Sequence, residues 1–236
     1  MKNLFGFLVL MIFASCVALG QAKPRPRPMA TPKPVAPKPT ATPEGISVLE
    51  KGAVIGRTYT NGKFKFEIVF PDTWMIPDDD FEAYMKSQGY DLSLKAPDSL
   101  SPQDKAAVNK AVKNITILLT AYRSLPGTSN NAIMRVAAED LSLNPQIKDA
   151  VDYFDAMRAA FKALKLPPDF QYSETQAEKL GTMQFAYLDT SSGAGKKRMY
   201  ATVRDGFAIM ITLSYTSDDD LMTMRRILEE GNFDLK

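Results

Sequence analysis

Proline is concentrated in one short stretch near the start of the chain, and this stretch limits where a folded core can form. Residues 23–45 read KPRPRPMATPKPVAPKPTATPEG, with eight of the 16 prolines and no aromatic residue. Such a segment cannot bury a core and favours an extended, polyproline-like conformation. It therefore predicts a disordered linker at 23–45, and the core must come from the 191 residues at 46–236, which is enough for one domain.

The residues before this linker have the pattern of an export signal. Lys2 precedes an apolar run at 4–14, which is too short to cross a bilayer and has the length of a signal-peptide core. Small residues offer cleavage before Gln21 or before Lys23, and we favour the second, which makes 1–22 the signal peptide. We therefore expect an exported protein, periplasmic or extracellular, with no transmembrane helix once the signal is removed.

The cysteine in the leader opens an alternative to a soluble exported protein. Phe13-Ala14-Ser15-Cys16 resembles a lipobox, in which the cysteine becomes acylated, although Phe13 stands where leucine is usual. An acylated Cys16 would tether the protein to a membrane across the linker. Cleavage near Ala22 would instead give a soluble mature protein, and the sequence leaves both outcomes open.

Two residue types are almost missing, and their scarcity excludes several classes of enzyme. The chain has no histidine, and its single cysteine is Cys16. A His-dependent triad, a His-ligated zinc site and thiol chemistry in the folded part are therefore excluded. Residues 46–236 hold 23 basic and 26 acidic residues, a net charge of −3, which argues against a nucleic-acid partner.

Alternating apolar residues predict strands at both ends of the domain. Asn61-Gly62 separates two β-prone runs, and the second run places Phe64, Phe66, Ile68 and Phe70 on one face, so a hairpin is expected there. Asp205-Gly206 predicts a second tight hairpin. Further strands are predicted at 115–120, 131–138, 182–189, 198–203 and 207–215.

Helical patterns lie between and after these strands. Residues 79–113 are expected to form a helical insertion, and 218–230 a terminal helix. The longest helix is predicted to begin at Asn144-Pro145 and to end before Pro167-Pro168. Its apolar stripe is Ile147, Val151, Phe154, Met157, Phe161 and Leu164. The chain at 46–236 is thus predicted to be one α+β domain, an antiparallel β-sheet flanked by helices.

Two aspartate triplets, at 78–80 and 218–220, stand directly before helical patterns. Carboxylates in that position cap free N–H groups and oppose the helix dipole. A calcium site is the alternative, but neither triplet has the alternating ligands, central glycine and terminal glutamate of an EF-hand loop. Capping is favoured, and no metal or cofactor is predicted.

Other motifs resemble known sites but lack their essential residues. Ser191–Lys197 holds glycines and lysines, yet it lacks the Walker spacing and leads into a strand, so we expect a mobile hairpin loop with solvated lysines. Glu139 and Asp140 are adjacent in a strand, so they point to opposite faces and cannot flank one bond. Neither Ser-x-x-Lys nor Gly-x-Ser-x-Gly occurs in 46–236, and no catalytic residue is nominated.

The single tryptophan of the chain, Trp74, follows the turn that ends the aromatic strand. A tryptophan in this place is expected to close one end of the core. A direct contact of Trp74 with a partner is the alternative.

The run from Tyr59 to Trp74 resembles the opening of PsbP-like and DcrB-like domains, where an aromatic strand ends in a Pro-x-x-Trp turn such as Pro71-Asp72-Thr73-Trp74. The later order of strands, long helix, three-stranded meander and terminal helix is similar too, so the resemblance covers about 57–235. It implies an α/β/α sandwich, used by exported or lumenal accessory proteins as a binding or assembly module without catalysis.

These features together predict an exported, non-enzymatic envelope protein that binds a protein partner or supports a complex. The alternative is an enzyme, such as a hydrolase, that uses carboxylates. The sequence does not indicate which partner or substrate is involved.

Overall fold

The computed structural model describes residues 49–235, apart from 89–91, 93–100, 127, 129–130, 164–165 and 194. This part of the chain builds two antiparallel β-sheets with helices beside them, which is an α+β fold, as the sequence predicted. The predicted signal peptide and linker lie outside the described residues.

The start of the domain forms a small sheet of its own. Strands β1 (Ala53–Ile55), β2 (Thr58–Asn61) and β3 (Phe66–Val69) pair in that order. The aromatic face predicted around β3 is buried, and Phe66 and Ile68 are both inside the core. The edge strand β1 was not predicted, because all three of its residues are exposed and its apolar side chains show no alternation.

The turn between β2 and β3 is longer than the two-residue turn that Asn61-Gly62 predicted. Asn61 pairs with Phe66, so four residues connect the strands. Lys65 takes the left-handed conformation, with φ of 54°. The Asn61 side chain lies inside the turn, where its Oδ1 accepts a hydrogen bond from the Phe64 N–H at 2.9 Å. Asn61 therefore stabilises the turn through its side chain and not through a left-handed backbone.

The rest of the domain is built on a large sheet of order β4-β5-β10-β9-β8-β6, with β7 also paired to β8. All its pairs are antiparallel. The strands are β4 (Ile115–Tyr122), β5 (Ile133–Asp140), β6 (Gln171–Tyr172), β7 (Gln176–Leu180), β8 (Met183–Ser192), β9 (Gly195–Arg204) and β10 (Phe207–Tyr215). The sequence did not predict β6 and β7, which are short and largely polar.

The hairpin between β9 and β10 has the turn that the sequence predicted. Asp205 and Gly206 have φ angles of 49° and 78°, and a two-residue hairpin of this type requires a positive φ at both positions. The tight turn fixes the register of β9 on β10, which is the central strand of the sheet.

A bulge in β4 changes which side chains face which core. The register on β5 shifts between Ile117 and Leu119, whereas simple alternation would place Ile115, Ile117 and Leu119 on one face. In the structure Ile115 and Ile117 pack with one core, and Leu119 packs with the other. The extra residue in the bulge is what turns the second half of β4 over.

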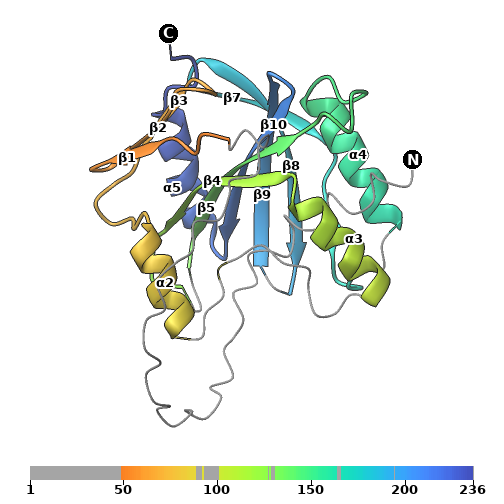
Figure 1. Cartoon of the computed structure of the whole chain (residues 1–236), viewed down its shortest axis with the longest axis horizontal. Coiled ribbons are helices and arrows are strands. Elements are labelled where there is room, and N and C mark those ends of the chain that lie inside the picture. The colour runs from red at the N-terminus through yellow and green to blue at the C-terminus, as the bar shows by residue number, and fades with distance from the viewer. Residues whose placement is uncertain are drawn as a thin grey trace, which may run out of the picture.

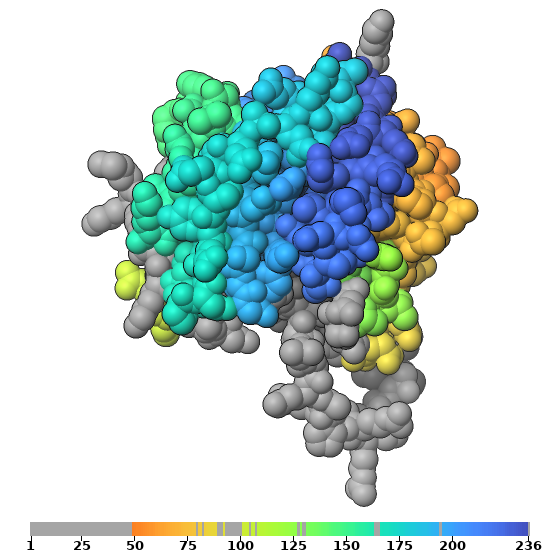
Figure 2. Space-filling model, turned by 180° about the vertical axis from the view of Figure 1, so that it is seen from behind, coloured from red at the N-terminus to blue at the C-terminus, as the bar shows by residue number. Residues whose placement is uncertain are grey.

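The two faces of the large sheet carry separate cores. One face packs against β1–β3 and the terminal helix α5 (Asp218–Glu229), and the other packs against α4 (Ala150–Ala163). Figure 1 shows α4 and α5 on opposite sides of the strands. Seen from behind, the dark-blue segment that holds α5 lies between the cyan strands β7 and β8 and the orange β1–β3 region (Figure 2).

The helical insertion expected at 79–113 contains α2 (Asp79–Ser87) and α3 (Pro102–Val112), and part of the connection between them lies outside the described residues. Met85 of α2 and Val108 of α3 are buried. Neither residue belongs to the two cores of the large sheet.

The longest helix starts five residues later than predicted. It begins at Ala150 and not at Pro145, because Asp149 caps it: its Oδ1 accepts hydrogen bonds from the N–H groups of Val151 and Asp152 at 2.8 and 2.9 Å. Ile147 is buried in the preceding loop, whereas Val151 is 52% exposed. Leu164 lies outside the described residues. The buried stripe of α4 is Tyr153, Phe154, Met157, Ala160 and Phe161.

Candidate functional site

Trp74 is a core residue, as the sequence predicted. Its side chain is 2% exposed, and its ring lies 6.0 Å from that of Phe70, centroid to centroid. Arg57 donates a hydrogen bond to the Trp74 carbonyl, which holds the turn against the small sheet. A contact with a partner through the indole would require Trp74 to leave this position.

The first aspartate triplet supplies a helix cap, as predicted, whereas the second lies in the first turn of a helix that a serine caps. The Asp78 Oδ1 accepts a hydrogen bond from the Phe81 N–H at 2.8 Å. At α5 the capping residue is Ser217, whose Oγ accepts from the Asp220 N–H at 3.2 Å. Asp220 is buried and pairs with Arg123, so this carboxylate also ties α5 to the end of β4.

The loop of the predicted Ser191–Lys197 segment joins β8 to β9, as expected for a hairpin. The expectation that both of its lysines are solvated was wrong for one of them. Lys196 reaches Asp218 at 3.3 Å with a half-exposed side chain, whereas Lys197 is buried. Alternation along β9 explains the difference, because adjacent residues lie on opposite faces and Lys197 falls on the face that carries α4.

Glu139 and Asp140 point to opposite faces of β5, as predicted. The exposed Asp140 accepts a hydrogen bond from the Ser142 N–H at 2.8 Å. Glu139 is only 4% exposed, and the Tyr153 hydroxyl of α4 donates to its Oε2 at 2.7 Å. Burial raises the pKa of Glu139 from 4.5 to about 8, and burial also raises the pKa of Tyr153. Sequence reasoning considered Glu139 only as half of a pair and missed its contact with Tyr153.

A second group of ionisable residues joins β7, β8, β9 and α5. We call it the Glu178 cluster, and its members are Glu178, Asp189, Arg198, Tyr200 and Arg225. Arg198 donates to both Asp189 oxygens at 2.8 Å and lies 3.6 Å from Glu178. The Tyr200 hydroxyl donates to Glu178 at 2.6 Å, and Arg225 pairs with the other Glu178 oxygen.

Both acids of the Glu178 cluster already have an arginine partner. Each of these carboxylates accepts a hydrogen bond from a guanidinium, and such charge-assisted bonds hold both acids in place within the fold. Burial raises the pKa of Tyr200, and its bond to Glu178 raises it further. Arg198 also stacks on the Tyr187 ring, 4.3 Å from its centroid. The residues of the Glu178 cluster come from three strands and a helix, so no local sequence pattern marks the cluster.

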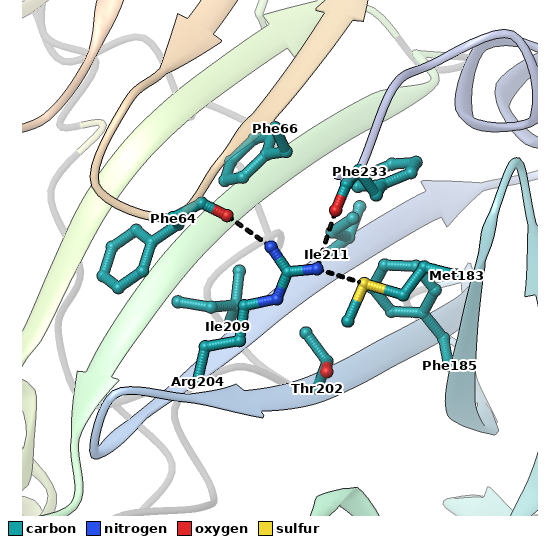
Figure 3. Close-up of a pocket in the computed structure, with 9 residues that line it drawn as sticks. All are labelled: Phe64, Phe66, Met183, Phe185, Thr202, Arg204, Ile209, Ile211 and Phe233. Atoms are coloured by element: carbon teal, nitrogen blue, oxygen red, sulfur yellow. Dashed lines mark hydrogen bonds between the residues drawn. The ribbon is translucent and has the colours of Figure 1, made fainter. Parts of the chain in front are cut away.

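An apolar pocket lies between the two sheets, and Figure 3 shows its lining. Four phenylalanines, Phe64, Phe66, Phe185 and Phe233, form much of its wall. The space open to the centre of a water molecule is only about 10 Å³, roughly what one water needs. This pocket therefore has no room for a substrate-sized molecule.

Arg204 crosses this pocket as a structural tie. Its Nη1 donates to the Phe64 carbonyl at 2.7 Å, and its Nη2 donates to the Phe233 carbonyl at 2.6 Å (Figure 3). The Met183 sulfur lies against the same Nη2. The guanidinium thus joins the β2–β3 turn, the C-terminal segment and the start of β8 in the large sheet.

Cys16, the predicted lipidation site, lies outside the described residues. Within residues 49–235 that are described, no helix is both long and apolar enough to cross a membrane.

Comparison with known proteins gives similarity in structure only. Neither a family model nor a curated protein matches the chain. Among solved structures, cyanobacterial PsbP (CyanoP) from Synechocystis sp. PCC 6803 matches at 15% identity and a TM-score of 0.40, over 75% of this chain and 94% of that one. LpqN of Mycobacterium tuberculosis, described as involved in cell envelope biogenesis, matches at 14% and 0.34, over 71% and 82%.

A third match is PA94 of Pseudomonas aeruginosa, described as a protein of unknown function and putative regulator. It is 17% identical with a TM-score of 0.31, over 56% of this chain and 81% of that one. A PsbP protein is thus among the solved structures similar to this chain, in line with the resemblance drawn from the sequence. With TM-scores below 0.5, these likenesses say nothing about what the protein does.

Proposed function

We propose that this protein is an exported accessory module of the cell envelope that works by binding a protein partner. The observation that supports this best is the state of three carboxylates. Glu139 is enclosed beneath α4, and Glu178 and Asp189 are each paired with an arginine. A general acid or base must come within hydrogen-bond reach of its substrate, and these groups are held by the fold itself. A partner would therefore bind to the outer surface of the domain and not in a catalytic site.

The proposal of export rests on the leader and the linker. A signal-like apolar run at 4–14 is followed by a proline-rich segment at 23–45, and a polyproline chain spans about 3.1 Å per residue. A linker of this kind lets a folded domain reach a partner at a distance from a membrane. It serves an acylated Cys16 as a spacer, and it is also compatible with release after cleavage near Ala22.

The partner is best sought by crosslinking in intact envelopes. The full chain, expressed from its own leader in the native host, is crosslinked, purified and analysed by mass spectrometry. We expect one envelope protein to be enriched in proportion to the amount of the chain, and to bind the purified chain saturably when it is produced separately. If no candidate binds the purified chain, the proposed function is wrong.

The competing function is a carboxylate-dependent hydrolase, and the raised pKa of Glu139 is the observation that favours it, since perturbed pKa values are common at catalytic sites. A broad screen of hydrolase substrates separates the two. We expect no turnover above that of a buffer control. Turnover that disappears in Glu139→Gln or Glu178→Gln, with the fold intact, would replace the binding proposal.

The attachment of the protein is tested by its intact mass after purification from the native host. We favour release, which predicts a mature N-terminus near Gln21 or Lys23. Acylation would give an N-terminal Cys16 with the added mass of the lipid, and a Cys16→Ser variant would then leave the membrane fraction. The folded domain should be unchanged in either case, because residues 49–235 form their cores without the leader.

A further inference from the structure

A buried carboxyl group lies where the first turn of α4 meets β5 of the large sheet, beside the main contact of α4 with β8 and β9. Glu139 stands on β5 directly opposite Ile115 of β4 and Ala208 of β10, so both of its cross-strand neighbours are apolar. On the side of the sheet that α4 covers, the Tyr153 hydroxyl donates a hydrogen bond to the Glu139 Oε2 at 2.7 Å. Glu139 and Tyr153 are 4% and 1% exposed. The carboxyl group is therefore almost fully shielded from water, with Tyr153 of α4 directly against it.

The charged groups around Glu139 do not neutralise it. Asp140 is its neighbour on the opposite face and disfavours a second negative charge. On its own face of β5, the next charged residue is Arg135, four positions along the strand and roughly 13 Å away at the strand rise, with Ala137 between them. On α4, the Asp152 carboxylate accepts from the Lys148 N–H at the start of the helix. A single hydrogen bond from Tyr153 is little compensation for a buried negative charge.

We propose that docking of α4 on the sheet is proton-linked: α4 packs closely while Glu139 carries a proton, and lifting α4 lets Glu139 lose that proton to water. The proton moves from the Glu139 carboxyl group to water, and no other covalent bond is made or broken. Acidic conditions therefore tighten α4, and a rise in pH towards 8 loosens it. For a domain outside the cytoplasm, this makes one face of the protein responsive to the pH around it.

The direction and the pH range follow from linkage. The pKa of Glu139 is about 8 with α4 docked and about 4.5 when the group is in water. The docked state therefore holds more protons between these values, and its advantage is complete below about pH 4.5 and lost as the pH rises through about 8. Above pH 8 both states are ionised and the opening equilibrium becomes independent of pH.

Hydrogen exchange of the intact purified chain tests the proposal between pH 5 and 9. Peptides from α4 report its opening, and peptides from α5 correct for the intrinsic effect of pH on exchange. We expect the opening constant of α4, relative to α5, to rise at least tenfold from pH 5.5 to 7.5 and then to level off. If α4 and α5 follow the same pH dependence, the proposal is wrong.

Two variants assign the effect to Glu139. Glu139→Gln cannot ionise but can still accept from Tyr153, so its α4 opening should be independent of pH. Asp140→Asn, the adjacent exposed residue, should keep the rise with pH, with its levelling-off point moved to slightly lower pH because the Asp140 charge raises the pKa of Glu139. A rise that persists unchanged in Glu139→Gln would overturn the proposal.

A third variant tests the proposal even if Glu139→Gln does not fold. The bond from Tyr153 lowers the pKa of Glu139, so Tyr153→Phe should move the levelling-off point to higher pH by a measurable fraction of a unit. A purely structural role for the tyrosine would lower protection equally at all pH values. That uniform loss, with no shift along the pH axis, would contradict the proposal. None of these outcomes depends on whether a protein partner exists.

Discussion

The two faces of the large sheet are covered in different ways. On one face a single helix, α4, lies over the strands with a continuous apolar stripe. On the other face the cover is assembled from short pieces, namely β1–β3, α5 and the C-terminal segment around Phe233. The turns and loops at the ends of such short pieces leave backbone carbonyls without a partner, whereas most carbonyls within a helix are paired inside it. Guanidinium groups fill this need on the second face, where Arg57 and Arg204 donate to carbonyls.

The face covered by short pieces, which we call the assembled face, thus depends on a few side chains that each make several hydrogen bonds. The face covered by α4, the helical face, depends on buried apolar area and on the hydrogen bond between Tyr153 and Glu139. Charge-assisted hydrogen bonds from arginine fix position as well as supply energy. A continuous stripe distributes its stabilisation over many contacts instead. The assembled face should therefore be the more sensitive to single substitutions.

The largest effect is expected from Trp74→Ala on the assembled face. Trp74 is 2% exposed beside Phe70, and removal of such a side chain leaves a cavity that the turn cannot fill. The free energy of unfolding should fall by about 3–5 kcal/mol, as measured by urea denaturation. Tyr84→Ala serves as the control, because Tyr84 is 58% exposed on α2 and its loss should cost less than about 0.5 kcal/mol. A normal urea midpoint in Trp74→Ala would show that the indole is not a core residue.

The next effect concerns the tie through Arg204. Arg204→Met keeps much of the apolar stem but leaves the carbonyls of Phe64 and Phe233 without their donor, and we expect a loss of about 2–3 kcal/mol in stability. Exchange of the C-terminal segment should rise more than that of α4. Arg226→Met is the matched control, since the Arg226 guanidinium makes no side-chain hydrogen bond within the described residues. Equal losses in the two variants would mean that Arg204 acts only through its bulk.

The same contrast explains which parts of the structure the sequence could predict. Local signals worked where one residue pair decides a conformation: Asp205-Gly206 supplies two positive φ angles, and Asp78 accepts from the Phe81 N–H. They failed where a distant contact decides. The bulge in β4 is set by pairing with β5, and the β2–β3 turn closes around the Asn61 side chain instead of using Asn61-Gly62 as its centre.

Candidate sites follow the same rule. The burial of Trp74 could be predicted, because a turn and an aromatic strand adjoin it in the sequence. The pairing of Glu139 with Tyr153 spans 14 positions, and that of Glu178 with Arg225 spans 47. No local pattern marks either pair, although Glu139 shares a strand face with Ala137 at the end of the apolar part of β5, and an acid at such a position is a signal that could have singled it out.

A smaller effect is expected at the start of α4. Asp149 accepts from the N–H groups of Val151 and Asp152, so Asp149→Ala should lower the free energy of unfolding by about 1 kcal/mol. Asp155→Ala is the control within the same helix, because Asp155 is exposed and makes one ion pair, with Arg158 at 2.6 Å; its loss should be within about 0.5 kcal/mol. Thermal or urea denaturation measures both. If Asp155→Ala is the more harmful change, the cap assigned to Asp149 is wrong.

The smallest effect separates the ion pairs of the two covering helices. Glu178 is 15% exposed where it meets Arg225 of α5, whereas Glu174 is 85% exposed where it meets Arg158 of α4. Water screens the second pair far more than the first, so a double-mutant cycle with alanine should give a coupling of about 0.5–1 kcal/mol for Glu178 with Arg225 and close to zero for Glu174 with Arg158. Added salt should reduce the first coupling only slightly, because a partly buried pair is less screened. Equal couplings would mean that the pair of Glu178 with Arg225 adds no more to the docking of α5 than the exposed pair adds to that of α4, and the contrast between the two faces would then rest on Arg57 and Arg204.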